Sequence, residues 1–168
     1  MDQVSSRFFL FDRGWAIVKS FRNSLIVTKQ TSEVIKTYNE SSVLETDSDR
    51  AMWGSEESMM SRFQLGLKVI DFGVISSWLD IGCSTGRFFS CAEEKGVLVD
   101  KMLGVAFSIP VIKIAKKRSY KGNVEFLTSS LESLPTSIGA FDLVTLVGVL
   151  QLCGCHPEKA ILKSLDKI

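Results

Sequence analysis

The residues whose types and spacing suggest chemistry lie in the stretch WLDIGCSTG, residues 78–86. A short apolar run that contains Asp80 leads into a turn with Gly82 and Gly86, and RFFSCAEEKG follows with the composition of a helix. A glycine-bearing turn between a strand and a helix often binds a charged small molecule, because glycines allow close approach and the helix start offers free N–H groups. The stretch therefore predicts a small-molecule site.

The glycine spacing narrows the class of ligand. A dinucleotide-binding dehydrogenase carries G-x-G-x-x-G, whereas residues 82–86 read GCSTG and Asp80 stands two residues ahead of the first glycine. No Gly-Lys-Ser/Thr follows, which excludes a phosphate-binding P-loop. A nicotinamide-dependent oxidoreductase is therefore disfavoured.

The elements that must position this turn alternate along the second part of the chain. The sequence predicts strands over 77–82, 102–107, 123–128 and 141–150 and helices over 86–95, 108–120 and 157–168. Ser108 and Pro110 suit the start of the second of these helices. Strands that are apolar nearly throughout and alternate with helices indicate an α/β fold with a Rossmann-like parallel sheet and helices on both faces.

The first part of the chain is less regular, and we expect residues 1–75 to form a mostly helical cap segment before a core over 76–168. Ser55 suits a helix start, and an apolar stripe at helical spacing follows it; the stripe consists of Met59, Phe63, Leu67 and Ile70. For residues 8–28 a helix is the preferred interpretation, and a pair of short strands has nearly equal support.

Bulk composition excludes several classes of function. The 168 residues fit one domain, and a net charge of +1 gives no general attraction to nucleic acid or anionic membranes. The N-terminus lacks the pattern of a secretory signal, and charged residues interrupt its apolar stretches. Four cysteines in such a chain suggest reduced thiols and a cytoplasmic protein.

The stretch LDIGCSTG resembles the first motif of class I S-adenosylmethionine-dependent methyltransferases, and the resemblance continues in order over about residues 76–168. LGVAFSIPVIKIAKKR, NVEFLTSSLESLP and FDLVTLVGVLQL resemble the family's next three strand regions, and PEKAILKSLDKI resembles the helix after them. The resemblance implies S-adenosylmethionine as cofactor and methyl transfer to a small-molecule acceptor.

The resemblance also implies which residues hold the cofactor. Asp80 would assist its ammonium end, Leu131 and Ile109 would contact adenine, and the backbone at Val147 and Gly148 would line the sulfonium end. The full expected set is Asp80, Gly82, Cys83, Ser84, Gly86, Ala106, Phe107, Ser108, Ser130, Leu131, Val147 and Gly148. Under the plainer alternative, Gly82 and Gly86 serve only a tight turn. Trp53 could lie over the donor pocket, although core packing is the preferred interpretation.

Three departures from the family pattern matter. Ala106 stands where relatives carry an acid for the ribose hydroxyls, and Ser130 stands where they often carry an aspartate near adenine. Ser108 is near enough to replace part of the missing acid. The chain also ends at Ile168, within the helix before the expected fifth strand, so we expect an incomplete core that is truncated after the fourth strand.

Without the later strands, the fourth strand would be an exposed apolar edge, which favours aggregation unless something covers it. The N-terminal segment, a second copy in a dimer, or a partner chain could cover this edge. These departures support a second hypothesis, namely a catalytically inactive or truncated methyltransferase-like module that serves in binding or assembly.

No catalytic triad is expected, because the cofactor carries the difficult chemistry. His156 and Gln151 are weak candidates for contact with the acceptor, and His156 is more simply a loop residue before Pro157. The run Cys153-Gly154-Cys155-His156 is too tightly spaced for an ordinary zinc site, so no metal is expected. The basic run KIAKKRSYKG reads as a solvated helix face.

Overall fold

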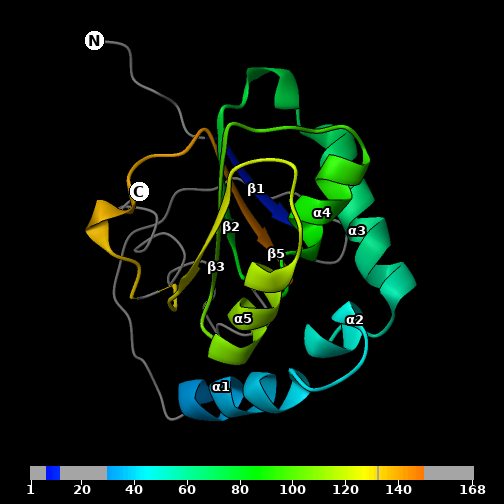
Figure 1. Ribbon diagram of the computed structural model, residues 1–168, viewed down its shortest axis with the longest axis vertical. Helices are drawn as coiled ribbons and strands as arrows, with labels where there is room; N and C mark the ends of the chain where they lie inside the picture. The colour runs from blue at the N-terminus through cyan, green and yellow to red at the C-terminus, as the bar shows by residue number, and fades with distance from the viewer. Residues whose placement is uncertain (1–6, 12–29, 132, 150–168) are drawn as a thin grey trace.

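The computed structural model describes residues 7–11, 30–131 and 133–149, and it contains a five-stranded parallel sheet with the order β1-β5-β2-β3-β4 (Figure 1). The strands are β1 (Arg7–Phe11), β2 (Ser77–Ile81), β3 (Lys101–Ala106), β4 (Val124–Thr128) and β5 (Leu143–Val147). The last four are the four strands that the sequence predicts, which confirms the α/β class with its parallel sheet.

The described helices are α1 (Gln30–Ser41), α2 (Asp47–Arg50), α3 (Glu56–Val69), α4 (Arg87–Glu94) and α5 (Ile109–Lys117), with short 3₁₀ turns η1 (Phe72–Val74) and η2 (Thr136–Ile138). Figure 1 shows α3 and α4 together on one side of the sheet, with α1 and α2 across one end of it. The predicted helix over 157–168 lies outside the described residues.

Local sequence signals account for most helix ends. Ser55 Oγ accepts a hydrogen bond from Ser58 N at 3.1 Å, which caps α3 as predicted. Pro110 lies in the first turn of α5, and Gly96 follows α4 with a φ of +80°. Ser108 is different: it occupies the N-cap position of α5 without a capping bond, and its hydroxyl instead donates to Asn39 Oδ1 at 2.8 Å.

The two faces of the sheet bury different side chains, because successive residues of a strand point to opposite faces. On the α3 and α4 side, Trp78 lies edge-on to Phe88 and Phe89, with ring centroids 5.0 and 4.8 Å away. The opposite side is mainly aliphatic and includes Leu79, Ile81, Val105, Val144 and Leu146.

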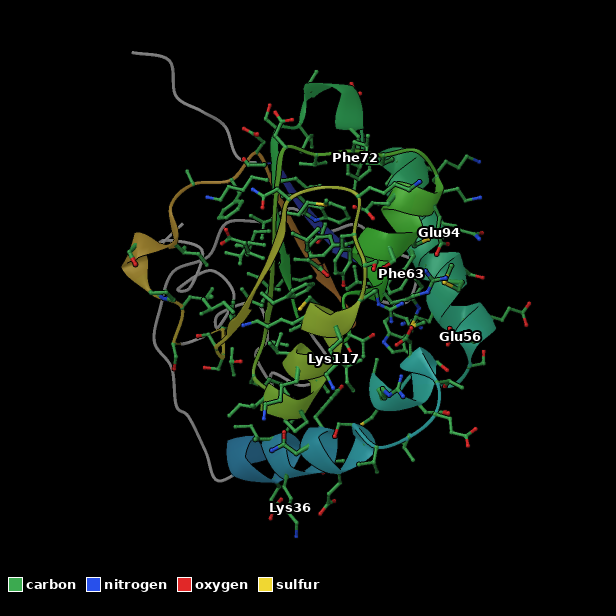
Figure 2. All side chains as sticks on the ribbon, viewed as in Figure 1. Lys36, Glu56, Phe63, Phe72, Glu94 and Lys117 are labelled. Atoms are coloured by element: carbon green, nitrogen blue, oxygen red, sulfur yellow. The ribbon has the colours of Figure 1, made fainter. Side chains whose placement is uncertain are left out.

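The apolar stripe of α3 belongs to the aromatic side of the core. Met59 and Phe63 are buried, and Phe63 stacks on Phe88 with ring centroids 4.7 Å apart. Figure 2 shows Phe63 directed inward, whereas the charged Lys36 and Glu56 project outward. The predicted inward stripe of α3 is therefore confirmed.

β1 corrects the helical interpretation of residues 8–28. Residues Arg7–Phe11 form a strand that pairs in parallel with β5, from Arg7 opposite Leu143 to Phe11 opposite Val147. Residues 12–28 lie outside the described part. The edge of β5 is thus covered by the N-terminal segment of the same chain, one of the three covers that the sequence allows.

Among the helices that the structure describes, none combines the length and the apolar character needed to cross a membrane.

Candidate functional site

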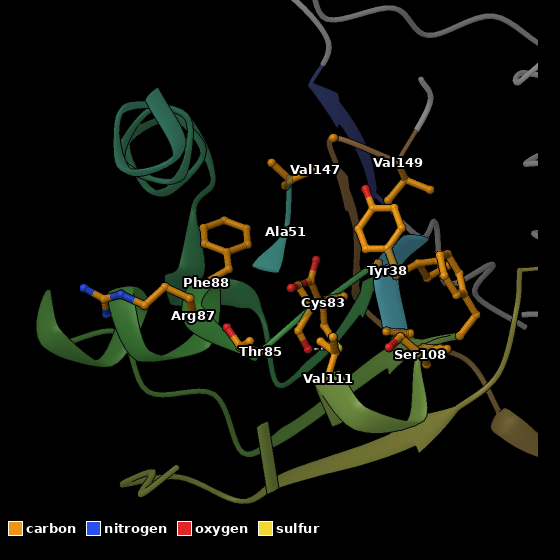
Figure 3. A pocket seen from close by; sticks show the side chains of 18 of the residues that line it. Tyr38, Ala51, Cys83, Thr85, Arg87, Phe88, Ser108, Val111, Val147 and Val149 are labelled. Atoms are coloured by element: carbon orange, nitrogen blue, oxygen red, sulfur yellow. Dashed lines mark hydrogen bonds between the residues drawn. The ribbon is translucent and has the colours of Figure 1, made fainter. Parts of the chain in front are cut away.

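A pocket lies at the carboxyl end of β2, where the order of the strands in the sheet reverses. The chain runs from β2 to β3 and β4 on one side, and β5 pairs with β2 on the other side. In open α/β sheets such a switch point leaves a crevice, and ligands bind there. The pocket is lined by the ends of β2, β3 and β5 and by residues of α1, α2 and α3 (Figure 3).

The pocket gathers almost all of the predicted cofactor residues. It is lined by Asp80, Gly82, Cys83, Ser84, Ala106, Phe107, Ser108, Ser130, Leu131, Val147 and Gly148. Gly86 does not line it, and Ile109 is 56% exposed and lies outside the lining. The structure therefore does not place Ile109 with Leu131, the other predicted adenine contact, in this pocket.

The turn after β2 depends on Gly82. Its φ is +81°, a conformation that favours glycine, and a Cβ there would collide with Val149. Two consecutive N–H groups, those of Gly82 and Cys83, donate to Val105 O at 2.7 and 3.1 Å, which anchors the turn to β3. Close packing and backbone conformation both require glycine at this position.

Gly86 has a different role from Gly82. It precedes α4 with a φ of +72°, and a Cβ there would collide with the Tyr120 hydroxyl and the Phe126 ring. Since Gly86 packs against the protein instead of lining the pocket, the tight-turn interpretation fits this glycine.

Ser84 lines the pocket and contains an unpartnered polar atom. Its backbone is left-handed with a φ of +49°, which is uncommon for a residue with a side chain. Its Oγ atom is buried and has no hydrogen-bond partner among the described residues. An orphaned buried hydroxyl costs stability unless a ligand or water satisfies it.

Asp80 is the buried acid of the pocket, with 3% of its surface exposed. Thr145 Oγ1 donates to Asp80 Oδ1 at 2.6 Å, and Trp78 Nε1 donates to Thr145 Oγ1 at 2.8 Å. Burial raises the pKa of Asp80 to about 7, although the bond from Thr145 opposes this rise. None of the described ion pairs includes Asp80. The site therefore lacks a protein cation for this carboxyl group.

Cys83 does not have the character of a reactive thiol. It is buried, and two causes raise its pKa above the ordinary value: burial, which is the larger, and the charge of Asp80. The thiol therefore stays protonated near neutral pH and is a poor nucleophile.

The short helix α2 forms part of the pocket wall, and Asp47 holds it against the turn. Asp47 Oδ1 accepts from Thr85 Oγ1 at 2.7 Å, and Asp47 Oδ2 accepts from Arg118 Nη2 at 2.8 Å. These bonds join α2 to the turn before α4 and to the end of α5. No local sequence pattern indicates this contact, because residues 47, 85 and 118 are far apart along the chain.

α1 closes another side of the pocket. Tyr38 lines it and meets the Phe107 ring edge-on, with centroids 5.3 Å apart. The Ser108 hydroxyl bond to Asn39 holds α1 against α5. Figure 3 shows Tyr38, Cys83 and Val147 around one opening, whereas Arg87 points away from it. Arg87 instead pairs with Glu94 at 2.6 Å.

Trp53 fits both interpretations that the sequence left open. Met52 ends α2 with a φ of +56°, and Trp53 N donates to Ser48 O at 2.8 Å, as in a Schellman ending. This turn places Trp53 against Gly148, where a Cβ would lie 2.7 Å from Trp53 Cζ2. Trp53 packs against the aromatic core and also lines the pocket.

The two departures from the family pattern remain visible in the site. Ala106 lines the pocket and brings no carboxylate to the end of β3. The Ser130 hydroxyl donates to Ser133 Oγ at 3.1 Å and accepts from Ser133 N at 3.3 Å. Ser108 is likewise engaged with Asn39. Ser129 Oγ donates to Ser130 O at 3.0 Å. Of the four serines that line the pocket, Ser84 alone has a hydroxyl without a partner among the described residues.

The weak catalytic candidates His156 and Gln151 and the cysteine pair 153 and 155 lie outside the described residues. Within the part that the structure describes, His, Cys, Asp and Glu side chains form no group that could hold a metal ion.

Comparison with known proteins defines the class. A family model described as a methyltransferase domain matches residues 79–168. The demethylmenaquinone methyltransferase of Lactococcus lactis is 39% identical over 74 residues, which cover 42% of this chain and 29% of that protein. The chain thus spans less than a third of the length of this curated relative.

Solved structures show the same fold. Phosphoethanolamine N-methyltransferase 1 of Haemonchus contortus, with S-adenosylhomocysteine, has a TM-score of 0.64 at 16% identity, covering 80% of this chain and 29% of that chain. Magnesium protoporphyrin IX methyltransferase from Synechocystis PCC 6803, also with S-adenosylhomocysteine, has a TM-score of 0.58 at 16% identity, covering 82% of this chain and 67% of that chain.

The fold is that of the class I S-adenosylmethionine-dependent methyltransferases, as the sequence resemblance predicts. This chain belongs to the methyltransferase-domain family.

Proposed function

We propose that the chain binds S-adenosylmethionine in the pocket at the end of β2 and transfers its methyl group to a small-molecule acceptor. The observation that carries this proposal is the pair of unmatched polar groups in the pocket. Among the residues that the structure describes, the buried acid Asp80 forms no ion pair and the buried hydroxyl of Ser84 has no hydrogen-bond partner. A ligand with a cationic amino group and hydrogen-bonding oxygens would satisfy both.

The residues present would divide the cofactor between them. Asp80 would accept from the ammonium group, and the turn at Gly82, Cys83 and Ser84 would receive the amino-acid end. Leu131 and Phe107 would provide apolar contact for the adenine. Bound S-adenosylmethionine would supply an electrophilic methyl group, so the protein contributes mainly orientation and exclusion of water.

The acceptor is proposed only as a class. The relatives named above act on demethylmenaquinone, phosphoethanolamine and magnesium protoporphyrin IX by their names, and all are small molecules. Apolar and aromatic side chains dominate the lining near Trp53, which favours an acceptor with apolar surface. The free thiols at Cys83 and Cys91 suit a reducing compartment, and we propose the cytoplasm.

A second candidate is a binding or assembly module without methyl transfer. The observation that favours it is Ala106, since the pocket lacks the ribose-binding acid at the end of β3. Loss of a charge-assisted hydrogen bond would weaken cofactor binding by about tenfold to a hundredfold.

Calorimetric titration with S-adenosylhomocysteine tests the proposal, and the reduced nicotinamide dinucleotide serves as control ligand. We expect binding of S-adenosylhomocysteine alone. Binding followed by methyl transfer in a screen of small acceptors supports the enzyme, and binding without turnover supports the second candidate. Absence of binding contradicts the enzyme and leaves the module without methyl transfer, and binding of the dinucleotide alone would favour the oxidoreductase class instead.

A further inference from the structure

Thr145 is a buried polar residue in the middle of an apolar strand. It lies in β5 between Val144 and Leu146, and none of the three is exposed to solvent. A threonine without partners at such a position would cost stability, because burying a hydroxyl removes it from water. Its two partners, Trp78 and Asp80, lie on the neighbouring strand β2.

The chemistry of these partners fixes the direction of both hydrogen bonds. An indole N–H can only donate, so Trp78 Nε1 gives its proton to Thr145 Oγ1 at 2.8 Å. The threonine hydroxyl has one proton, and it does not use that proton in the bond from Trp78, in which its oxygen accepts. The hydroxyl can therefore donate to Asp80 Oδ1 at 2.6 Å. The two hydrogen bonds therefore have one direction, from Trp78 through Thr145 to Asp80.

This direction determines what Asp80 can do. Oδ1 must accept, so any proton that the carboxyl group carries must be on Oδ2. A bond donated to a carboxylate favours its ionised form, whereas a hydroxyl free to turn would serve the protonated form as well. A protonated carboxyl group is neutral and binds a cation weakly, whereas an ionised one attracts it.

We propose that Thr145 is a positioning residue that holds Asp80 as a hydrogen-bond acceptor for the cationic amino group of the ligand. Trp78 fixes the orientation of the Thr145 hydroxyl. This inference rests on the proposed function, because it assigns the ligand's amino group to Asp80. Neither Thr145 nor Trp78 lines the pocket, so both act through Asp80.

The other titratable groups around the pocket do not hold Asp80 as a hydrogen-bond acceptor, which is the role that we assign to Thr145. On the described elements these groups are Tyr38 of α1, Asp47 of α2, Cys83 of the turn and Arg87 of α4. Burial raises the pKa values of Tyr38 and Cys83, so both are neutral near pH 7. Asp47 is paired with Arg118, and Arg87 is paired with Glu94.

The test compares Thr145→Val with Thr145→Ser in the full chain. Valine keeps the shape and removes the donor, whereas serine keeps the donor. The pKa of Asp80 is measured from its carboxyl carbon by nuclear magnetic resonance, and S-adenosylhomocysteine binding is titrated from about pH 5 to 8. Thr128→Val, at the exposed end of β4, is the matched control. Near-ultraviolet circular dichroism confirms folding.

We expect Thr145→Val to raise the pKa of Asp80 and to weaken binding about tenfold at neutral pH, with the pH at which binding improves displaced upward. Thr145→Ser and Thr128→Val should match the unmodified chain. Trp78→Phe, which leaves the hydroxyl in place but undirected, should fall between them. If Thr145→Val does not fold, the pKa of Asp80 and the binding affinity are measured in Trp78→Phe, where we expect smaller changes in the same direction.

Unchanged pKa and unchanged pH profile in Thr145→Val would overturn the inference. A loss of affinity that is equal at every pH would overturn it as well, because a merely structural role produces that result. The carboxyl titration does not depend on a ligand. If the unmodified chain fails to bind S-adenosylhomocysteine, the proposed function fails, while the titration still decides whether Thr145 controls Asp80.

Discussion

Two aspartates at opposite ends of the β2–β5 pair have opposite surroundings. Asp142, just before β5, accepts three hydrogen bonds at Oδ2, from Ser76 N at 3.0 Å, Ser77 N at 2.8 Å and Ser77 Oγ at 2.9 Å. Asp80, at the other end of β2, accepts one bond from Thr145. The bonds from Ser77 and Ser76 lower the pKa of Asp142, whereas burial raises that of Asp80.

The difference separates an acid that the protein itself satisfies from the acid to which we assign the ligand's amino group. The three bonds satisfy Asp142 within the protein, and they clip the starts of β2 and β5 together far from the pocket. The burial of Asp80 is compensated only in part, which costs stability in the free protein and leaves a place for a cation.

The largest expected effect concerns the pH dependence of stability. The folded-state pKa of Asp80 is about 7, above its ordinary value of 3.8, so between these values the folded state holds a proton that the unfolded state has released. Stability therefore falls as pH rises, by about 1.4 kcal/mol per pH unit. Asp80→Asn should remove this fall, which urea unfolding at several pH values measures. Parallel profiles for the two proteins would contradict the comparison.

The second prediction concerns binding by the same variant. Asp80→Asn should weaken S-adenosylhomocysteine binding on the order of a hundredfold, because the ligand's amino group loses a charged acceptor. Calorimetry measures the change, and Asp142→Asn is the matched control because it alters an acid of the same strand pair. Equal affinities of the two variants would remove the functional distinction between the acids.

A third variant adds an acid to the ligand end. Ala106→Asp should strengthen S-adenosylhomocysteine binding by about tenfold, because position 106 lines the pocket where the family carries its ribose-binding acid. Competition with a fluorescent analogue provides the measurement. A variant that folds and binds no better would mean that the end of β3 does not face the ribose.

The smallest effect is expected at the structural acid. Asp142→Ala should lower the free energy of unfolding by about 1 kcal/mol, because it leaves the N–H groups of Ser76 and Ser77 to water at a half-exposed site. S-adenosylhomocysteine affinity should not change. Denaturant unfolding and calorimetry on one preparation decide this, and a matching loss of affinity would show that the two ends are coupled.

Sequence and structure agree best where the signal is local. The glycine turn, the four strands after residue 76 and the Ser55 cap depend on neighbouring residues, and each is found where the sequence predicts it. The interpretation of residues 8–28 as a helix was wrong over residues 8–11, which belong to β1. An apolar segment takes the form that its partner strand allows, and that partner, β5, is more than a hundred residues away.

The amino-acid sequence by itself determined the fold class and the place of the glycine turn, since hydrophobic periodicity and glycine spacing are local properties of the chain. The resemblance of its motifs to those of methyltransferases indicated the family. Only the tertiary structure decided that β1 covers β5 and that Asp47 holds α2 against the turn. It also decided that the Ser84 hydroxyl has no partner among the described residues, whereas Ser108 and Ser130 form hydrogen bonds. It also placed Thr145 and Trp78 behind Asp80. Burial and hydrogen-bond partners arise from contacts between distant segments, and these contacts set the pKa of Asp80.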